Sequence, residues 1–487
     1  PQLVSDSEAF EVMRLVFTGL TSYDPAGGAV IPGVAESWEA NEDNTVWTFH
    51  LREGTTFSDG SPVTAQSFVD GINRLADPDL ASPVAYHGSL AGITGYDEVN
   101  GADTTDAVGD QPVEGVVAVD DYTLEIHTNA PNVYIPKIVA HPAFSPVNME
   151  LTQSDTWGEQ PIGNGPYMMA EPWQHDVSIT LNRNDSYYGE PGNPDTVEFL
   201  MFADETAAFQ ALLDGQIDVM GSIPAESEEQ ARAQYDDFTE QPGGSFGYLG
   251  FPTQVAPYDN PEMRKALVMA VDREAIVTQV MKQQVANGFV PPVAYGAVDG
   301  LDTCAACAFD ADAAKELFDS LGGIPGNSVS IVFNAGAGHE DWIEAVANDW
   351  TNNLGLDVSF ESMEWAAYLD FLFATEESPT QPFRLGWLWD YPSAYNFLAP
   401  LYQSGSSDNY SHYSNPDFDA LMDQAAQSAT EDDAIPFLEQ AQEILGEEVP
   451  VMPMNYGVAK FAWNDTVDNV KFNNFGFFLW EDMEDLG

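Results

Sequence analysis

The order of apolar and polar positions along the chain predicts a mixed α/β protein. Residues 45–52 alternate between apolar and polar side chains, as a half-buried strand does, and a turn-rich stretch centred on Asp59-Gly60 follows. Thr64 is a suitable N-cap for an amphipathic helix that begins at residue 65. This part of the chain therefore predicts a hairpin that leads into a helix. Residues 113–128 predict two more strands.

Farther along the chain, helical and extended patterns alternate. Residues 205–215 predict a helix that ends at a glycine, and residues 262–281 predict one long helix that follows Pro261. A strand over 328–333, a helix over 339–355 and a strand over 356–363 predict a βαβ crossover. The stretch 95–112, rich in Gly, Asp and Thr, predicts a surface loop.

Length and charge limit the classes of protein. A chain of 487 residues predicts two to four domains. Its 79 acidic and 14 basic residues give a net charge of −65, which repels nucleic-acid phosphates and anionic lipid heads. We therefore expect no nucleic-acid partner, and we interpret the acidity as solvation of a large surface. No run of about 18 apolar residues predicts a membrane span.

The side chains that usually carry catalysis or bind cofactors are scattered. The seven histidines occur singly, and no nucleotide-binding glycine motif follows a strand, so we expect no metal and no cofactor. Cys304 and Cys307 are too few for a zinc ribbon and suggest a local disulfide outside the cytoplasm, with a reduced pair as the alternative. Gly243, Ser245 and Gly247 match G-x-S-x-G, but the glycines precede a strand rather than follow one. We therefore do not expect an enzyme.

The scarce basic residues are the more informative ones. Arg384 opens an aromatic stretch, predicted to be a strand, that ends near Asp390. The two residues share parity and therefore one face, up to about 20 Å apart on an extended strand, too far to pair. Such a face is suited to the two ends of a zwitterionic ligand such as a short peptide. Alternatively, each charge pairs with another residue. Trp387 and Trp389 are either core residues or ligand platforms.

At the level of motifs, the chain resembles the family 5 extracellular solute-binding proteins of ABC importers, which include oligopeptide-, dipeptide- and nickel-binding proteins. The resemblance runs nearly end to end and is most specific at GVAESWEANEDNTVWTFHLREGTTFSDGSPVTAQSFVDGINRL. The segments that carry it are 33–75, 161–189, 209–224, 256–277, 310–322, 386–402 and 407–425.

This resemblance implies a periplasmic-binding-protein-like α/β fold with two lobes joined by a hinge and an extra domain inserted in the first lobe. The expected first lobe is 1–30 with 160–245 and 458–487, the inserted domain is 31–159, and the second lobe is 246–457. The resemblance also implies that Asp390 holds a peptide's α-amino group and Arg384 its carboxylate. The other residues expected to line the cleft are Trp387, Trp389, Tyr391, Phe17, Thr18, Gly19, Phe246 and Tyr248.

The function implied by the resemblance is capture rather than catalysis. We expect a monomeric receptor, lipid-anchored or periplasmic, that binds short peptides between its lobes and delivers them to the permease subunits of an ABC transporter. A lipid-modified cysteine would precede residue 1. The alternative is a binding protein for an oligosaccharide or another neutral solute, for which aromatic side chains would supply stacking surfaces.

Overall fold

The computed structural model describes residues 1–4, 7–24, 28–101, 111–202, 204–224, 227–298, 304–335, 338–372, 379–406, 408–473 and 475–486. The chain divides into two compact units, which we call unit 1 (1–240 with 460–487) and unit 2 (241–459). Both crossings fall at long strands, β11 (Thr239–Gly250) and β16 (Val451–Trp463). Among the described residues, no helix has the length and apolarity needed to cross a bilayer.

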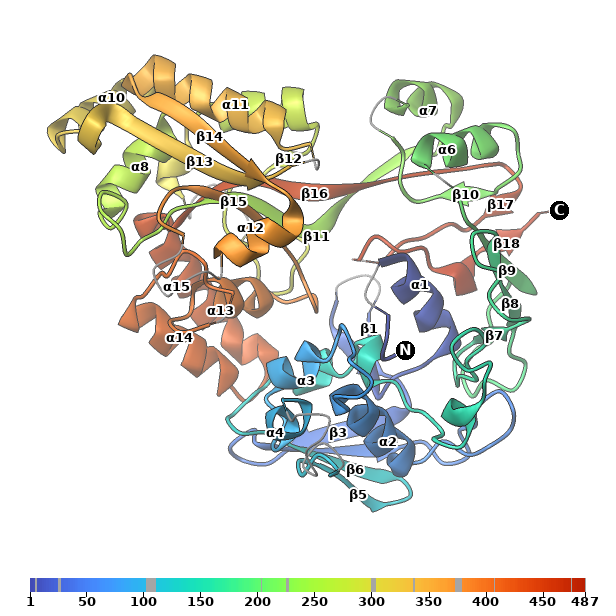
Figure 1. Ribbon diagram of the computed structural model, residues 1–487. Helices are drawn as coiled ribbons and strands as arrows, with labels where there is room; N and C mark the ends of the chain where they lie inside the picture. The colour runs from blue at the N-terminus through green and yellow to red at the C-terminus, as the bar shows by residue number, and fades with distance from the viewer. Residues whose placement is uncertain are drawn as a thin grey trace. The chain divides into compact units, whose positions relative to one another are not determined.

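Unit 1 contains an antiparallel sheet in the order β3-β4-β6-β5. Its strands are β3 (Ala35–Ala40), β4 (Val46–Leu51), β5 (Val116–Asp120) and β6 (Thr123–His127). Alternate residues of β4 are buried, which confirms the strand predicted at 45–52. Helix α2 (Ala65–Ala76) packs on β5 and β6 (Figure 1). The backbone N–H of its N-cap Thr64 donates to Ser67 Oγ at 3.2 Å. The predicted helix start is confirmed.

The surface loop predicted at 95–112 is wrong in its first part. Residues Tyr96–Asn100 form helix α4, and Tyr96 and Val99 are buried. The Tyr96 hydroxyl donates to the carbonyl of Ala85 at 2.8 Å, just before helix α3 (Tyr86–Ala91). Composition did not reveal this buried anchor. The rest of the range, from 102 to 110, lies outside the described residues.

A second sheet in unit 1 holds the first helix of the chain. Strands β7 (Tyr167–Met169), β8 (Ser178–Arg183) and β9 (Thr196–Leu200) are antiparallel, and their apolar side chains share a core with α1 (Ser7–Val16). The smaller elements of unit 1 are β1 (Thr21–Tyr23), β2 (Val30–Pro32), α5 (Ile135–Ile138), α6 (Glu205–Leu213), β10 (Val219–Met220), α7 (Glu228–Gln234), β17 (Val467–Asp468) and β18 (Glu484–Asp485).

Unit 2 is built on a mixed sheet in the order β16-β11-β15-β13-β14, with β12 (Gln284–Val285) paired to β16. Strand β13 (Ser328–Asn334) is parallel to β14 (Asp357–Met363) and to β15 (Phe383–Leu388). Helix α11 (Glu340–Asp349) connects β13 to β14 and lies beside them (Figure 1). The predicted βαβ crossover is confirmed. The remaining helices are α10 (Ala311–Ser320), α12 (Trp365–Leu372), α13 (Tyr395–Tyr402), α14 (Pro416–Ala426) and α15 (Glu431–Glu448).

The single helix predicted over 262–281 is wrong, because the chain breaks it. Helix α8 (Pro261–Met269) ends, and Asp272 caps a new helix, α9 (Arg273–Ala275), by accepting the backbone N–H of Ala275 at 3.0 Å. A π-helical segment continues to Met281. Asp272 therefore acts as a cap, a role that the continuous apolar pattern hid.

Two of the scarce arginines in unit 2 serve packing. Arg273 donates to the carbonyls of Ala286 and Pro453, each at 2.7 Å, and Arg264 donates to the carbonyl of Tyr258 at 2.7 Å. Burial lowers the pKa of each guanidinium to about 10. A disulfide joins Cys304 to Cys307, and Arg273 also donates to the Cys307 carbonyl. These cations hold segments of unit 2 together rather than a ligand.

Candidate functional site

A cavity of about 510 Å³ lies in unit 2 against strands β11 and β15. These strands are antiparallel, with Phe246 opposite Trp387 and Tyr248 opposite Leu385. The structure therefore brings together four of the residues predicted from the sequence, since Phe246, Tyr248, Trp387 and Arg384 all line this cavity. We call it the unit 2 cavity.

Arg384 supplies the positive charge of the unit 2 cavity. Its Nη1 donates to the Asn334 Oδ1 at 3.2 Å. Burial lowers its pKa, and the neighbouring groups that oppose this shift are the phenols of Tyr368 and Tyr248. Among the described residues, no carboxylate forms an ion pair with Arg384. A guanidinium that lines a cavity without an ion-paired carboxylate favours an anionic group there.

His339 lies beside Arg384 in the same cavity and was not predicted as a site residue. Burial, followed by the charge of Arg384, lowers the pKa of His339 to about 4, so the ring is neutral at pH 7. Its Nδ1 accepts the indole N–H of Trp342 at 3.2 Å, which leaves the proton on Nε2. The neutral ring therefore offers one donor. Its sequence signal was its place after a parallel strand, where α/β proteins bind ligands.

Aromatic side chains form much of the remaining wall. Trp342, Trp365 and Trp387 all line the unit 2 cavity, and Trp365 is 48% exposed. Leu388, at the end of β15, is 59% exposed and lines it as well. Exposed apolar groups of this size beside a half-buried cation suit a ligand with both apolar and anionic parts.

Asp390 lies just after β15 and is not among the residues that line the unit 2 cavity. Its backbone N–H donates to the Asn396 Oδ1 at 2.8 Å, and its Oδ2 accepts from the Asn396 Nδ2 at 2.9 Å. The side chain of Asp390 is half-buried. Its predicted role at the amino end of a ligand stays a prediction.

Trp389 and Tyr391 are core residues, 4% and 2% exposed, and neither lines the unit 2 cavity. The indole of Trp389 packs over Gly244, where an added Cβ would lie 2.0 Å from the ring. This close approach explains the glycine at the first variable position of the G-x-S-x-G motif. Ser245 itself lies within β11, opposite Leu388, and not on a strand-to-helix turn. The geometry of a nucleophile elbow is therefore absent at Ser245.

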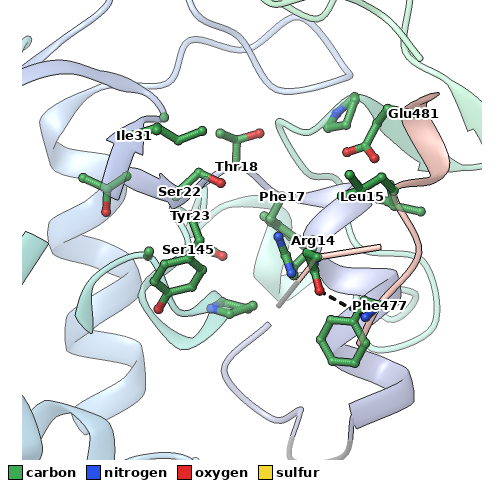
Figure 2. Close-up of a pocket in the computed structure, with 18 of the residues that line it drawn as sticks. Arg14, Leu15, Phe17, Thr18, Ser22, Tyr23, Ile31, Ser145, Phe477 and Glu481 are labelled. Carbon is green, nitrogen blue, oxygen red and sulfur yellow. Dashed lines mark hydrogen bonds between the residues drawn. The ribbon is translucent and has the colours of Figure 1, made fainter. Parts of the chain in front are cut away.

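Phe17, Thr18 and Gly19 lie elsewhere, in a cavity of about 230 Å³ in unit 1, which we call the unit 1 cavity (Figure 2). They follow α1 directly. The buried Asn164 fixes this turn, because its Oδ1 accepts the Thr18 backbone N–H at 3.1 Å and its Nδ2 donates to the Thr18 carbonyl at 2.9 Å. The Thr18 hydroxyl lies 3.2 Å from that of Tyr187.

Half-buried charged side chains on α1 and in the C-terminal segment also line the unit 1 cavity, among them Glu11, Arg14 and Glu481. Arg14 lies over the rings of Phe475 and Phe477, with Cζ 5.6 and 6.0 Å from their centroids. Glu11 Oε1 accepts the Phe478 backbone N–H and the Trp480 indole N–H, each at 3.0 Å. Burial raises the pKa of Glu11 to about 7. Glu11 is therefore a carboxyl that titrates near neutrality.

Comparison with known proteins gives the family. Residues 29–409 match the bacterial extracellular solute-binding proteins, family 5 (middle region). The chain belongs to the family 5 extracellular solute-binding proteins. The resemblance seen in the sequence motifs is confirmed, and so is the expectation of a solute-binding protein.

Curated family 5 relatives match over nearly the whole chain. The oligopeptide-binding protein OppA of Bacillus subtilis is 29% identical over 96% of this chain and 87% of its own length. The periplasmic oligopeptide-binding protein OppA of Salmonella typhimurium is 30% identical over 97% of this chain and 89% of its own.

Solved structures of the family agree with the fold. The unliganded open form of the periplasmic murein tripeptide-binding protein MppA has a TM-score of 0.86 and 28% identity, covering 100% of this chain and 94% of that one. OppA of Haemophilus influenzae in complex with RPPGFSPFR has a TM-score of 0.73 and 25% identity, covering 100% and 96%. The predicted periplasmic-binding-protein-like α/β fold is confirmed. The predicted lobe and insert boundaries stay a prediction.

Proposed function

We propose that this protein captures short peptides outside the cytoplasm and delivers them to the permease subunits of an ABC importer. The observation that carries the proposal is the unit 2 cavity, which the half-buried Arg384 lines without an ion-paired carboxylate among the described residues. The names of the relatives, oligopeptide-, dipeptide- and murein peptide-binding proteins, support a peptide as the ligand.

In this proposal the two ends of the peptide meet opposite charges. Arg384, helped by the neutral Nε2–H of His339, receives the ligand carboxylate, and Asp390 receives the α-amino group. Trp387 and Trp365 contact side chains, while hydrogen bonds to the peptide main chain give affinity that depends little on sequence. Phe17, Thr18 and Gly19 stay predicted ligand contacts, and the cavity that they line in unit 1 supports this.

The protein works as a monomer in this proposal, either in the periplasm or held at the outer face of the membrane by a lipid anchor. Several relatives are named as periplasmic proteins, which supports a location outside the cytoplasm. No cofactor takes part, because capture and release of a ligand need only binding contacts.

A second candidate ligand is an oligosaccharide or another neutral solute. The observation that favours it is the set of three tryptophans that line the unit 2 cavity, since indole faces stack on sugar rings. In that case, loss of Trp387 would weaken binding more than loss of Arg384 or Asp390.

Native mass spectrometry of the purified protein, followed by denaturing release of what it carries, tests the proposal first. Masses that fit peptides of a few residues support it, and a sugar mass supports the second candidate. Calorimetric titration with tripeptides then measures affinity directly. A panel of tripeptides that all fail to bind would refute the peptide proposal.

A further inference from the structure

Asn396 is a fully buried amide in the first turn of helix α13, and its hydrogen bonds converge on two predicted site residues. Its Oδ1 accepts the backbone N–H of Asp390 at 2.8 Å and the indole N–H of Trp387 at 3.3 Å. Its Nδ2 donates to the Asp390 Oδ2 at 2.9 Å. One side chain therefore contacts the backbone and carboxylate of one residue and the indole of another.

This arrangement defines the orientation of the amide. Two N–H donors face one end of the Asn396 side chain and a carboxylate faces the other, so exchanging its oxygen and nitrogen would oppose like groups at all three contacts. A side chain of this length must both accept from the two N–H groups and donate to the carboxylate, and asparagine does both. Aspartate lacks the donor, and leucine lacks both the donor and the acceptor.

Asn396 is itself held firmly. Its side chain is 0% exposed, and its backbone N–H donates to the carbonyl of Ser393, which is also 0% exposed, at 3.1 Å. Phe397 and Leu398, the next residues of α13, are both buried. Asn396 therefore has a fixed position from which it restricts the rotation of the Asp390 carboxylate.

We infer that Asn396 is the positioning residue that orients the Asp390 carboxylate toward the ligand's α-amino group and ties that carboxylate to the indole of Trp387 in the cavity wall. This inference rests on the proposed function. An N–H donor to a carboxylate is a charge-assisted hydrogen bond, and a carboxylate held in one orientation loses less entropy when an ammonium group binds it. No motif in the sequence singled out Asn396.

The test compares two ligands, a tripeptide with a free α-amino group and the same tripeptide with an N-acetyl group. Asn396→Ala should weaken binding of the free tripeptide by about tenfold or more and of the acetylated one by less than about twofold. Asp390→Asn should show the same contrast. Both substitutions act on the same contact, that between the Asp390 carboxylate and the α-amino group. The double variant should therefore bind the free tripeptide about as weakly as Asp390→Asn alone.

Asn409→Ala is a matched control for stability. Asn409 is also a buried amide of unit 2, and its side chain donates to the carbonyls of Gln403 and Tyr413 and accepts the Tyr413 N–H. It does not line the unit 2 cavity. Its loss should lower thermal stability but leave both affinities unchanged. If Asn396→Ala does not fold, Asn396→Asp keeps nearly the same volume and an acceptor for the two N–H groups but removes the donor to the carboxylate.

If Asn396→Ala lost affinity equally for the free and the acetylated tripeptide, Asn396 would have a structural role only, and the inference would be overturned. Unchanged binding of the free tripeptide in a folded variant would overturn it as well. Failure of the proposed function gives a different result, because the unaltered protein would then bind neither tripeptide. In that case the positioning role of Asn396 would be refuted as well.

Discussion

Replacing Glu11 by glutamine should change how the stability of unit 1 depends on pH. Glu11 accepts hydrogen bonds from the Phe478 N–H and the Trp480 indole, and burial raises its pKa from 4.5 to about 7. A folded-state pKa above the unfolded value means that the folded protein binds more protons between those two pH values. The free energy of unfolding therefore falls as the pH rises from about 4.5 to about 7.

The size of this effect follows from the shift of the pKa. A difference of about 2.5 pH units corresponds to roughly 3 kcal/mol, an upper limit because Glu11 keeps some exposure. Glutamine keeps an oxygen to accept both N–H groups but carries no charge. We therefore expect Glu11→Gln to match the unaltered protein near pH 4.5 and to exceed its stability at pH 8 by up to about 3 kcal/mol.

Urea denaturation at constant ionic strength between pH 4.5 and 8 measures this difference. Comparing two proteins of nearly equal charge removes the general effect of acid on a chain with a net charge of −65. Glu229→Gln is the control, because it removes an exposed carboxylate from α7, another helix of unit 1. Its pH profile should follow that of the unaltered protein. A Glu11→Gln profile parallel to the unaltered one across the range would refute the reasoning.

Three further predictions concern unit 2. Arg384→Gln should weaken binding of a tripeptide by tenfold or more in calorimetry but should hardly affect the same tripeptide with a C-terminal amide, and equal losses would contradict a carboxylate contact. Arg264→Met should lower the free energy of unfolding by about 2–4 kcal/mol, because backbone carbonyls lose their buried donor, whereas Lys315→Met on the surface should have little effect. Gly244→Ala should destabilise by about 1–3 kcal/mol, since its Cβ would meet the Trp389 ring at 2.0 Å, while a Cβ at Gly243 meets only ordinary contacts. Similar denaturation midpoints for the two alanine variants would disprove this account of Gly244.

Much of the fold can be predicted from the sequence because the patterns that specify its helices and strands are local. The alternation at 45–52, the cap at Thr64 and the crossover from 328 to 363 each depend on neighbours in the sequence, and each prediction is confirmed. The helix at Tyr96 and the break at Asp272 were missed. In the first case a distant carbonyl anchors a polar-looking stretch, and in the second a side-chain cap interrupts an apolar pattern.

The candidate site shows the same division. Arg384, Trp387, Phe246 and Tyr248 were found because the scarcity of basic residues and the family motifs pointed to them. His339 was not found, although its place after a predicted strand of the crossover was a signal, and Asn396 was not found because a lone asparagine carries no chemical signal until its partners are known. Trp389 shares parity with Trp387, which lines the unit 2 cavity, yet the packing of Trp389 over Gly244 places its indole in the core.

The sequence by itself determined the family, the α/β class and the residue types available for binding, since these depend on periodicity, charge and motifs that survive without coordinates. The tertiary structure alone decided which of these residues share a cavity, which arginines donate their hydrogen bonds to backbone carbonyls, and which buried amide contacts the Asp390 carboxylate. The physical reason is that burial and hydrogen-bond pairing join residues far apart in the chain, such as Arg384 and Asn334, and no local pattern encodes such pairs.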